Sequence, residues 1–353
     1  MLSLSKVNLT IFSLNIPLFL SLGQPLGRTI LGPKANILSI KRDDLASYIK
    51  TNYTADRMVL VGTGGVEHND LVSLAKKHFS SLPVSPTPIP LGRASHPKPN
   101  FVGSEVRIRD DDIPTAHIAI AVEGVGWNSP DYFPMMVMQG IFGNWDRSLG
   151  SSSLTSSRLS HIISTNNLAN SFMSFSTSYS DTGLWGIYLV SENLVNLDDL
   201  THFTLREWTR MSVGPTEAEM ERAKSQLKAG LLLGLDGTTA VAEDIGRQMV
   251  TCGKRMTPQE IESAVDAVTV DEIKRVAQKY LWDKDVSTLF YFLFHHPLKL
   301  TKSFDDRLLL LPLEALMVFW ITTAFVLICP LWCIRYLFFP LCMSNFKLTI
   351  IYG

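Results

Sequence analysis

The sequence predicts an α+β fold in which an antiparallel-rich sheet is flanked by helices, with a further hydrophobic helix near the C-terminus. Three observations predict it. Short apolar or alternating segments are typical of strands, longer segments with apolar residues three and four positions apart are typical of helices, and residues 315–334 contain no charged side chain. A Pro-rich stretch from Pro83 to Pro99 divides the chain into a small block and a larger one.

The composition is that of a globular body with hydrophobic ends. The chain has 353 residues, which is long enough for two domains. Charged residues make up 18% of it and the net charge is −1, so there is no electrostatic case for nucleic-acid binding. Cys252 is the one cysteine of the central part, and no disulfide framework or CxxC motif is visible.

The block before the Pro-rich stretch is predicted to form a helix over 43–52, a buried strand over 58–61 and a helix over 69–79. Gly62 to Gly65 form a turn between the last two. These glycines are not a phosphate-binding loop, because the Gly-Lys-Ser/Thr that completes such a loop is absent. A strand, turn and helix in this order are typical of the end of an α/β unit.

The block after it alternates between strands and helices. The expected strands are 104–109, 116–122, 173–178 and 184–190, the last two forming an antiparallel pair; the expected helices are 130–142, 197–211 and 217–235. Three Thr-x-x-Glu capping boxes mark helix starts, at Thr216, Thr257 and Thr269. The aromatic and Met residues of 130–142 are expected to be core, and 144–160 is expected to be a Ser-rich connection.

Five motifs, in one order and spacing, resemble a known family. They are QPLGRTILGP at 24–33, NYTADRMVL at 52–60, IFGNWDRSLG at 141–150, SYSDTGLWG at 178–186 and EDIGRQ at 243–248. Together they resemble the β-subunits of mitochondrial processing peptidases, which belong to the M16 (pitrilysin-like) metallopeptidases. The resemblance covers about three quarters of the chain, from about residue 25 to 285, and it implies M16-type α/β domains.

Catalysis in this family needs an inverted zinc motif, H-x-x-E-H, on a helix. The two His would bind the metal, and the Glu would polarise a zinc-bound water. None of the eight His residues lies in H-x-x-E-H or in H-E-x-x-H; they are His68, His78, His96, His117, His161, His202, His295 and His296. We therefore assign no catalytic, cofactor-binding or metal-binding residue to this chain, although complete family members bind zinc.

The resemblance implies a division into five parts. Residues 1–24 are a divergent hydrophobic N-terminus, 25–82 the remnant of an M16 N-terminal domain, 83–100 a Pro-rich linker, 101–286 an M16 C-terminal-type domain, and 287–353 a divergent hydrophobic tail. Because most of its sheet would be missing, the remnant is expected to be poorly stable without a partner that covers it.

The two hydrophobic ends allow several interpretations. Residues 315–334 are long and apolar enough to cross a bilayer as a helix, which predicts membrane contact. Alternatively, the tail arises from a different exon or a mistaken gene model. The first 22 residues fit neither a secretory signal, since Pro17 interrupts the apolar run, nor a mitochondrial presequence, since they contain no Arg.

The resemblance implies a mitochondrial protein, in the matrix or at the inner membrane. Family members of this kind pair with a processing-peptidase α-subunit and remove presequences from imported precursors. Because the zinc motif is absent, we expect this chain not to be catalytic alone. Two alternatives remain: a non-catalytic assembly role like that of the core subunits of respiratory complex III, and a truncated product without a function of its own.

Overall fold

The centre of the molecule is a mixed seven-stranded sheet. The computed structural model describes residues 32–88, 98–109, 114–149, 157–292 and 349–352. The strands lie in the order β3-β4-β5-β2-β6-β1-β7. Their bounds are β1 Glu105–Arg109, β2 Ala116–Gly124, β3 Asn144–Asp146, β4 Ser171–Ser178, β5 Gly183–Ser191, β6 Ser287–Phe292 and β7 Thr349–Tyr352.

Most neighbouring strands are antiparallel. β2 pairs with β5 and β6, and β4 pairs with β3 and β5, all antiparallel, whereas β1 runs parallel to β6 and β7. The predicted antiparallel pair of 173–178 and 184–190 is therefore confirmed as β4 and β5. β1 and β2 follow each other in the chain but are not neighbours, because β6 lies between them.

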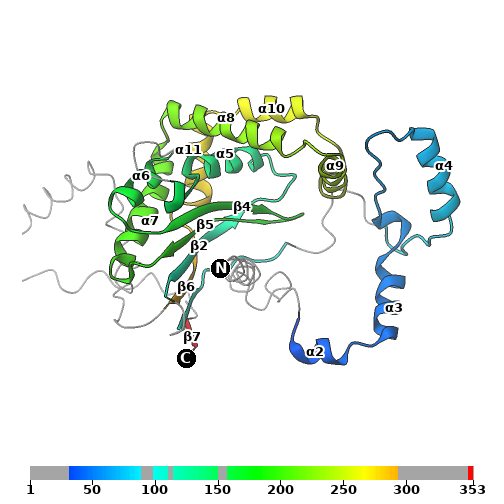
Figure 1. Cartoon of the computed structure of the whole chain (residues 1–353), viewed down its shortest axis with the longest axis horizontal. Coiled ribbons are helices and arrows are strands. Elements are labelled where there is room, and N and C mark those ends of the chain that lie inside the picture. The colour runs from blue at the N-terminus through cyan, green and yellow to red at the C-terminus, as the bar shows by residue number, and fades with distance from the viewer. Residues whose placement is uncertain (1–31, 89–97, 110–113, 150–156, 293–348, 353) are drawn as a thin grey trace, which may run out of the picture.

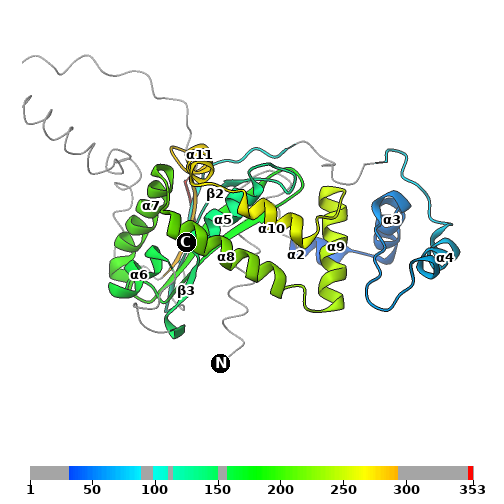
Figure 2. The same ribbon diagram turned by 90° about the horizontal axis from the view of Figure 1, so that it is seen from above.

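Helices cover one face of the sheet, as Figures 1 and 2 show. The helices that follow β2 in the chain are α5 Tyr132–Phe142, α6 Arg158–Thr165, α7 Leu197–Val213, α8 Glu217–Leu233, α9 Thr238–Cys252, α10 Pro258–Asp266 and α11 Val270–Tyr280. Trp185 of β5 lies in the centre of the main core, fully buried, with its ring 5.4 Å from Phe142 and 5.1 Å from Trp208. Alternate residues of β2 and β5 form the sheet side of this core, and apolar side chains of α5, α6, α7, α8, α10 and α11 form its helical side.

The predicted helix starts are confirmed. The Thr216, Thr257 and Thr269 side chains each accept a hydrogen bond from the backbone N–H three residues on, and the Glu at that position reaches back to the cap. α6 begins in the same way with Ser157 and Ser160, inside the segment expected to be only a connection. That segment also contains β3, so it has more regular structure than its Ser content indicated.

The N-terminal segment, residues 32–88, is built differently. It contains α2 Lys34–Ser39, α3 Arg42–Asn52, the short 3-10 helix η2 Ala55–Arg57 and α4 His68–Phe79, and none of these includes a buried residue. Figures 1 and 2 both place α3 and α4 beyond α9, away from the sheet. The Thr63 hydroxyl donates a hydrogen bond of 2.8 Å to the carbonyl of Thr238, at the start of α9.

The prediction of a buried strand over 58–61 is wrong. The structure has no strand there, and the side chains of Met58 and Leu60 are 42% and 53% exposed. A strand needs a neighbour to accept its backbone hydrogen bonds, and none of the described strands lies beside this one. The helices predicted on either side of it are confirmed as α3 and α4.

The sheet continues past residue 286. β6 begins at Ser287 and lies between β2 and β1, with Phe290 fully buried in the main core. The predicted hydrophobic helix over 315–334 lies outside the described residues. Within the described part of the chain, none of the helices combines the length and the apolar character needed to cross a membrane.

Candidate functional site

The donor groups in the described structure do not fit a catalytic zinc ion. No group of three or more His, Cys, Asp or Glu side chains in the described ranges is placed to hold a metal. His68 and His78 both lie on α4, exposed and ten residues apart, so that about 15 Å of helix separates them. His117 is buried in β2, where its Nδ1 lies 2.6 Å from the Tyr188 hydroxyl.

The remaining His residues are placed just as poorly for a shared metal. His161 on α6 and His202 on α7 are exposed, and His96, His295 and His296 lie outside the described residues. The expectation that the chain has no metal site of its own thus stays a prediction, which the arrangement of the described donors supports.

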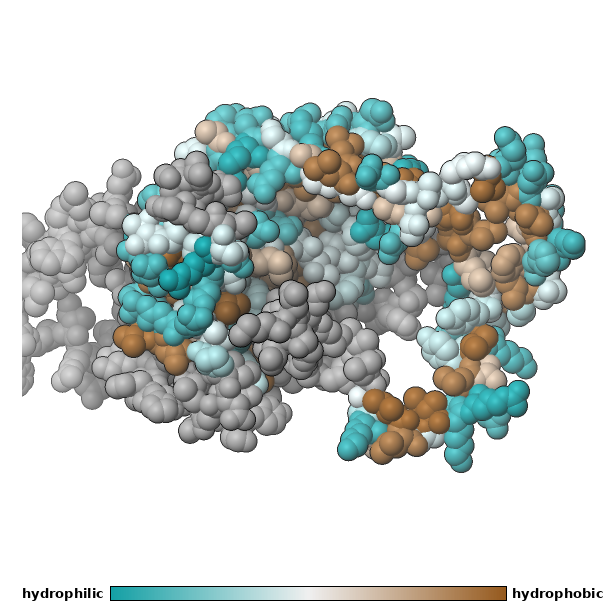
Figure 3. Space-filling view, viewed as in Figure 1, coloured by the Kyte–Doolittle hydropathy of each residue, from teal (hydrophilic) through white to brown (hydrophobic). Residues whose placement is uncertain are grey.

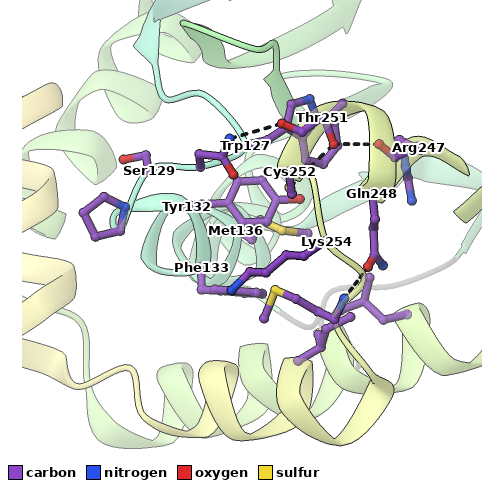
Figure 4. Close-up of a pocket in the computed structure, with 15 residues that line it drawn as sticks. Trp127, Ser129, Tyr132, Phe133, Met136, Arg247, Gln248, Thr251, Cys252 and Lys254 are labelled. Carbon is purple, nitrogen blue, oxygen red and sulfur yellow. Dashed lines mark hydrogen bonds between the residues drawn. The ribbon is translucent and has the colours of Figure 1, made fainter. Parts of the chain in front are cut away.

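A cavity of about 380 Å³ lies beside the C-terminal end of α9. It lies between the loop before α5, the first turns of α5, the end of α9 and the loop that leads to α10 (Figure 4). The lining is mainly aromatic and apolar, with two cations; it consists of Trp127, Asn128, Ser129, Pro130, Tyr132, Phe133, Met136, Leu231, Arg247, Gln248, Thr251, Cys252, Lys254, Met256 and Ile261.

Three aromatic rings form one wall of the cavity. The Tyr132 ring lies 5.4 Å from Trp127, tilted by 42°, and 5.2 Å from Phe133, nearly edge-on at 73°. Such edge-to-face arrangements are favourable because the positive edge of one ring meets the negative face of the next. The guanidinium carbon of Arg247 lies 5.4 Å from the centre of the Trp127 ring, within range of a cation–π interaction.

Hydrogen bonds hold the walls together. The Asn128 side chain donates to the Thr251 carbonyl over 3.1 Å, and the Gln248 side chain accepts from the Met256 backbone N–H over 2.7 Å. Gly253 ends α9 in the left-handed conformation, with φ of 72°, which turns the chain back towards the cavity. The first bond fixes the loop before α5 against the end of α9, and the second fixes the loop after α9 against the same helix.

The Tyr132 hydroxyl stays protonated at neutral pH. Burial raises its pKa to about 12, which outweighs the opposite effect of the nearby Arg247. The wall therefore carries no negative charge at physiological pH. The lining contains no Asp or Glu, but Arg247 is paired with Asp244 of its own helix over 2.9 Å, so the Lys254 charge is the one that no described carboxylate pairs.

A charged cluster fixes the start of α5 beside the cavity. Asp131 is almost fully buried and accepts hydrogen bonds from Arg275 over 2.7 Å, from Lys279 over 2.8 Å and from the Tyr280 hydroxyl over 2.9 Å. Burial alone would raise the pKa of Asp131, but these three hydrogen bonds outweigh it and lower the pKa to about 2. The cluster ties α5 to α11 across the helical layer.

We expect Asp131→Asn to lower the free energy of unfolding by about 1–3 kcal/mol, because an amide cannot replace a charged acceptor of three hydrogen bonds. The folded-state pKa of Asp131, about 2, lies below its ordinary value of 3.8, so the carboxylate stabilises the fold at pH values above 3.8. That contribution is lost as the pH falls towards 2. Urea unfolding of both proteins at several pH values measures the difference.

The control is Asp236→Asn, since Asp236 is exposed between α8 and α9. It should change stability by less than about 0.5 kcal/mol. A destabilisation by Asp131→Asn that stayed constant from neutral pH to pH 2 would contradict the role given to the carboxylate charge.

The cavity was not among the sequence predictions. Tyr132, Phe133 and Met136 were expected to be core, and the structure places them at the boundary: they are partly buried and line the cavity, while Val137 and Ile141 of the same helix are core. The residues opposite them come from α9, more than 100 positions away. The sequence signal closest to the site was the EDIGRQ motif, which includes Arg247 and Gln248.

Comparisons with known proteins show the family. The model of the Peptidase M16 inactive domain matches residues 39–227. The chain is 84% identical over 264 residues to the mitochondrial-processing peptidase subunit beta of Lentinula edodes, covering 74% of this chain and 57% of that protein. It is 52% identical over 267 residues to the subunit of the same name in Saccharomyces cerevisiae, covering 75% of this chain and 58% of that protein.

The solved structures agree with these sequence matches. A chain in the structure of complex III2 from Candida albicans with Inz-5 bound superimposes with a TM-score of 0.75 at 30% identity, covering 82% of this chain and 69% of that one. This chain spans somewhat more than half the length of the curated relatives that it matches. With the family model matched over more than half of its residues, the chain belongs to the M16 peptidase family and is similar to the β-subunits of mitochondrial processing peptidases.

Proposed function

We propose that this chain acts as a non-catalytic binding scaffold related to the β-subunit of the mitochondrial processing peptidase. The observation that carries the proposal is the combination of 84% identity to such a subunit with the lack of H-x-x-E-H anywhere in the 353 residues. The part that is matched is described as the inactive domain of the family. We expect the matched part to contribute recognition rather than zinc chemistry.

The partner that follows from the relatives is a processing-peptidase α-subunit, and the setting is the mitochondrion. Presequence peptides are the ligands that the assembled complex would bind. The exposed apolar side chains of the N-terminal segment support a role in assembly, because a helix without a buried face gains stability only when a partner covers it.

Association with an α-subunit tests this proposal. The purified chain is mixed with the α-subunit of a fungal processing peptidase, and the molar mass is measured by size-exclusion chromatography with light scattering. We expect a complex with one copy of each subunit. Elution of the two proteins as separate species at micromolar concentrations would overturn the proposed partnership.

A second candidate is a structural role in respiratory complex III. It is favoured by the superposition with a chain of the Candida albicans complex III2 structure over 82% of this chain. The two candidates are distinguished by native gel electrophoresis of mitochondria that express the tagged chain. Migration with complex III rather than with the processing peptidase would favour the second.

A further inference from the structure

We propose that the cavity between α5 and α9 binds a small aromatic carboxylate. Its volume of about 380 Å³ lies within the range of roughly 300–1,000 Å³ that is usual for small-molecule sites. Figure 4 shows the side chains of Trp127, Tyr132 and Phe133 arranged along one side of it. This site and its ligand are independent of the zinc chemistry of the family and of the proposed partnership.

The aromatic wall selects a flat ring. Tyr132 already contacts Trp127 and Phe133 in tilted and edge-on geometry, and the rest of the floor is supplied by aliphatic or sulfur-containing side chains, including Met136 and Ile261. A ligand ring placed against this wall continues the same edge-to-face packing and displaces water from apolar surface. Because the hydrogen bonds of Asn128 and Gln248 hold the walls in place, little ordering is needed on binding.

The two cations select a negative charge on that ring. The Arg247 guanidinium is paired with the Asp244 carboxylate of its own helix through one hydrogen bond of 2.9 Å, and because a guanidinium has five N–H donors, further donors remain for a ligand. Lys254 makes no hydrogen bond or ion pair with the described residues, and Figure 4 shows its side chain reaching across the cavity towards Phe133. Arg247 and Lys254 therefore stand at the same cavity with donors available for one carboxylate.

The occupant is a small acid and not a fatty acid or a peptide segment. An acyl chain could be buried against the rings but could not continue their edge-to-face packing, and the lining comes from helices and loops, with no strand edge that could pair with a peptide backbone. Cys252 also lines the cavity and is not in a disulfide. The rate at which its thiol is alkylated can therefore show whether a ligand occupies the cavity.

Binding of 2-naphthoate by the full chain tests the proposal, with neutral 2-naphthamide as the matched ligand. Isothermal titration calorimetry at low salt gives both dissociation constants. We expect naphthoate to bind about tenfold more tightly than naphthamide, a preference typical of a charge-assisted contact at a partly exposed site. Arg247→Gln and Lys254→Gln should each reduce this preference by about threefold, and the double variant should remove it.

Two controls locate the ligand. Lys274→Gln removes an exposed cation of α11, away from the cavity, and should leave the preference unchanged. Saturating naphthoate should also slow alkylation of Cys252, measured by mass spectrometry of the peptide that contains it. The proposal is overturned if neither ligand binds in the millimolar range, if the double variant retains the preference for naphthoate, or if Cys252 is alkylated at the same rate with and without it.

Discussion

Gly186→Val is expected to destabilise the central sheet severely. Gly186 lies in the middle of β5, opposite Ala121 of β2 and Phe175 of β4. A Cβ at this position would stand 2.9 Å from the Cα of Ala121 and 2.7 Å from the Phe175 ring, and it would also meet the Ile120 carbonyl. Two of these three contacts are backbone atoms of a central strand, which cannot move aside without breaking the ladder of hydrogen bonds.

Overpacking a core usually costs about 1–3 kcal/mol, and we expect about 3 kcal/mol or more here because the clash is with backbone. Urea unfolding followed by circular dichroism should show a large fall in the transition midpoint, or no folded baseline at all. The matched control is Gly230→Ala in α8, where a Cβ meets nothing within 4 Å. That change should raise stability by about 0.5–1 kcal/mol. A Gly186→Val protein with the wild-type midpoint would contradict the packing described for β5.

Limited proteolysis of the isolated chain is expected to cut within residues 32–88 at least tenfold faster than within the sheet domain, residues 98–292. The reason is burial. The side chains of Leu38, Tyr48 and Ile49 are 77%, 61% and 56% exposed, whereas the sheet domain has a continuous core. Helices without a buried face open locally at little cost in free energy, and open segments are what proteases cleave.

Figure 3 shows the same contrast, with hydrophobic surface gathered over the part of the molecule that contains α2, α3 and α4. Trypsin is a suitable probe because Lys76 and Lys77 are exposed on α4, while the similarly exposed Lys274 and Lys279 on α11 provide matched sites within the sheet domain. Time-resolved mass spectrometry gives the two rates. Equal rates in the isolated chain would show that the N-terminal segment is as stable as the sheet domain.

Local features of the fold were predictable from the sequence. The Thr-x-x-Glu boxes at Thr216, Thr257 and Thr269 depend on residues three apart, and all three are present in the structure. The β4–β5 pair was predictable because only a short turn joins its two strands, so the pairing partner is close in the chain. In both cases the interacting residues lie close together in the chain, so a short stretch of sequence is enough to predict the contact.

Features that depend on distant residues were not predictable. Residues 58–61 have a strand-like pattern but no described neighbouring strand, so the pattern alone gave a wrong prediction. β6 pairs with β1 and β2, which lie more than 160 residues earlier, and its place in the sheet is set by those partners. The cavity joins Tyr132 and Phe133 to Arg247 through the packing of α5 against its neighbours, and no spacing within one segment encodes it.

Cleavage of a presequence peptide by the complex of this chain with an α-subunit, with zinc added, tests the central claim most directly. The α-subunit alone and a complete processing peptidase are the two references. Because the chain lacks H-x-x-E-H, the account predicts a cleavage rate no greater than that of the α-subunit alone and unchanged by a metal chelator. Cleavage above that of the α-subunit alone, abolished by the chelator and restored by zinc, would contradict it.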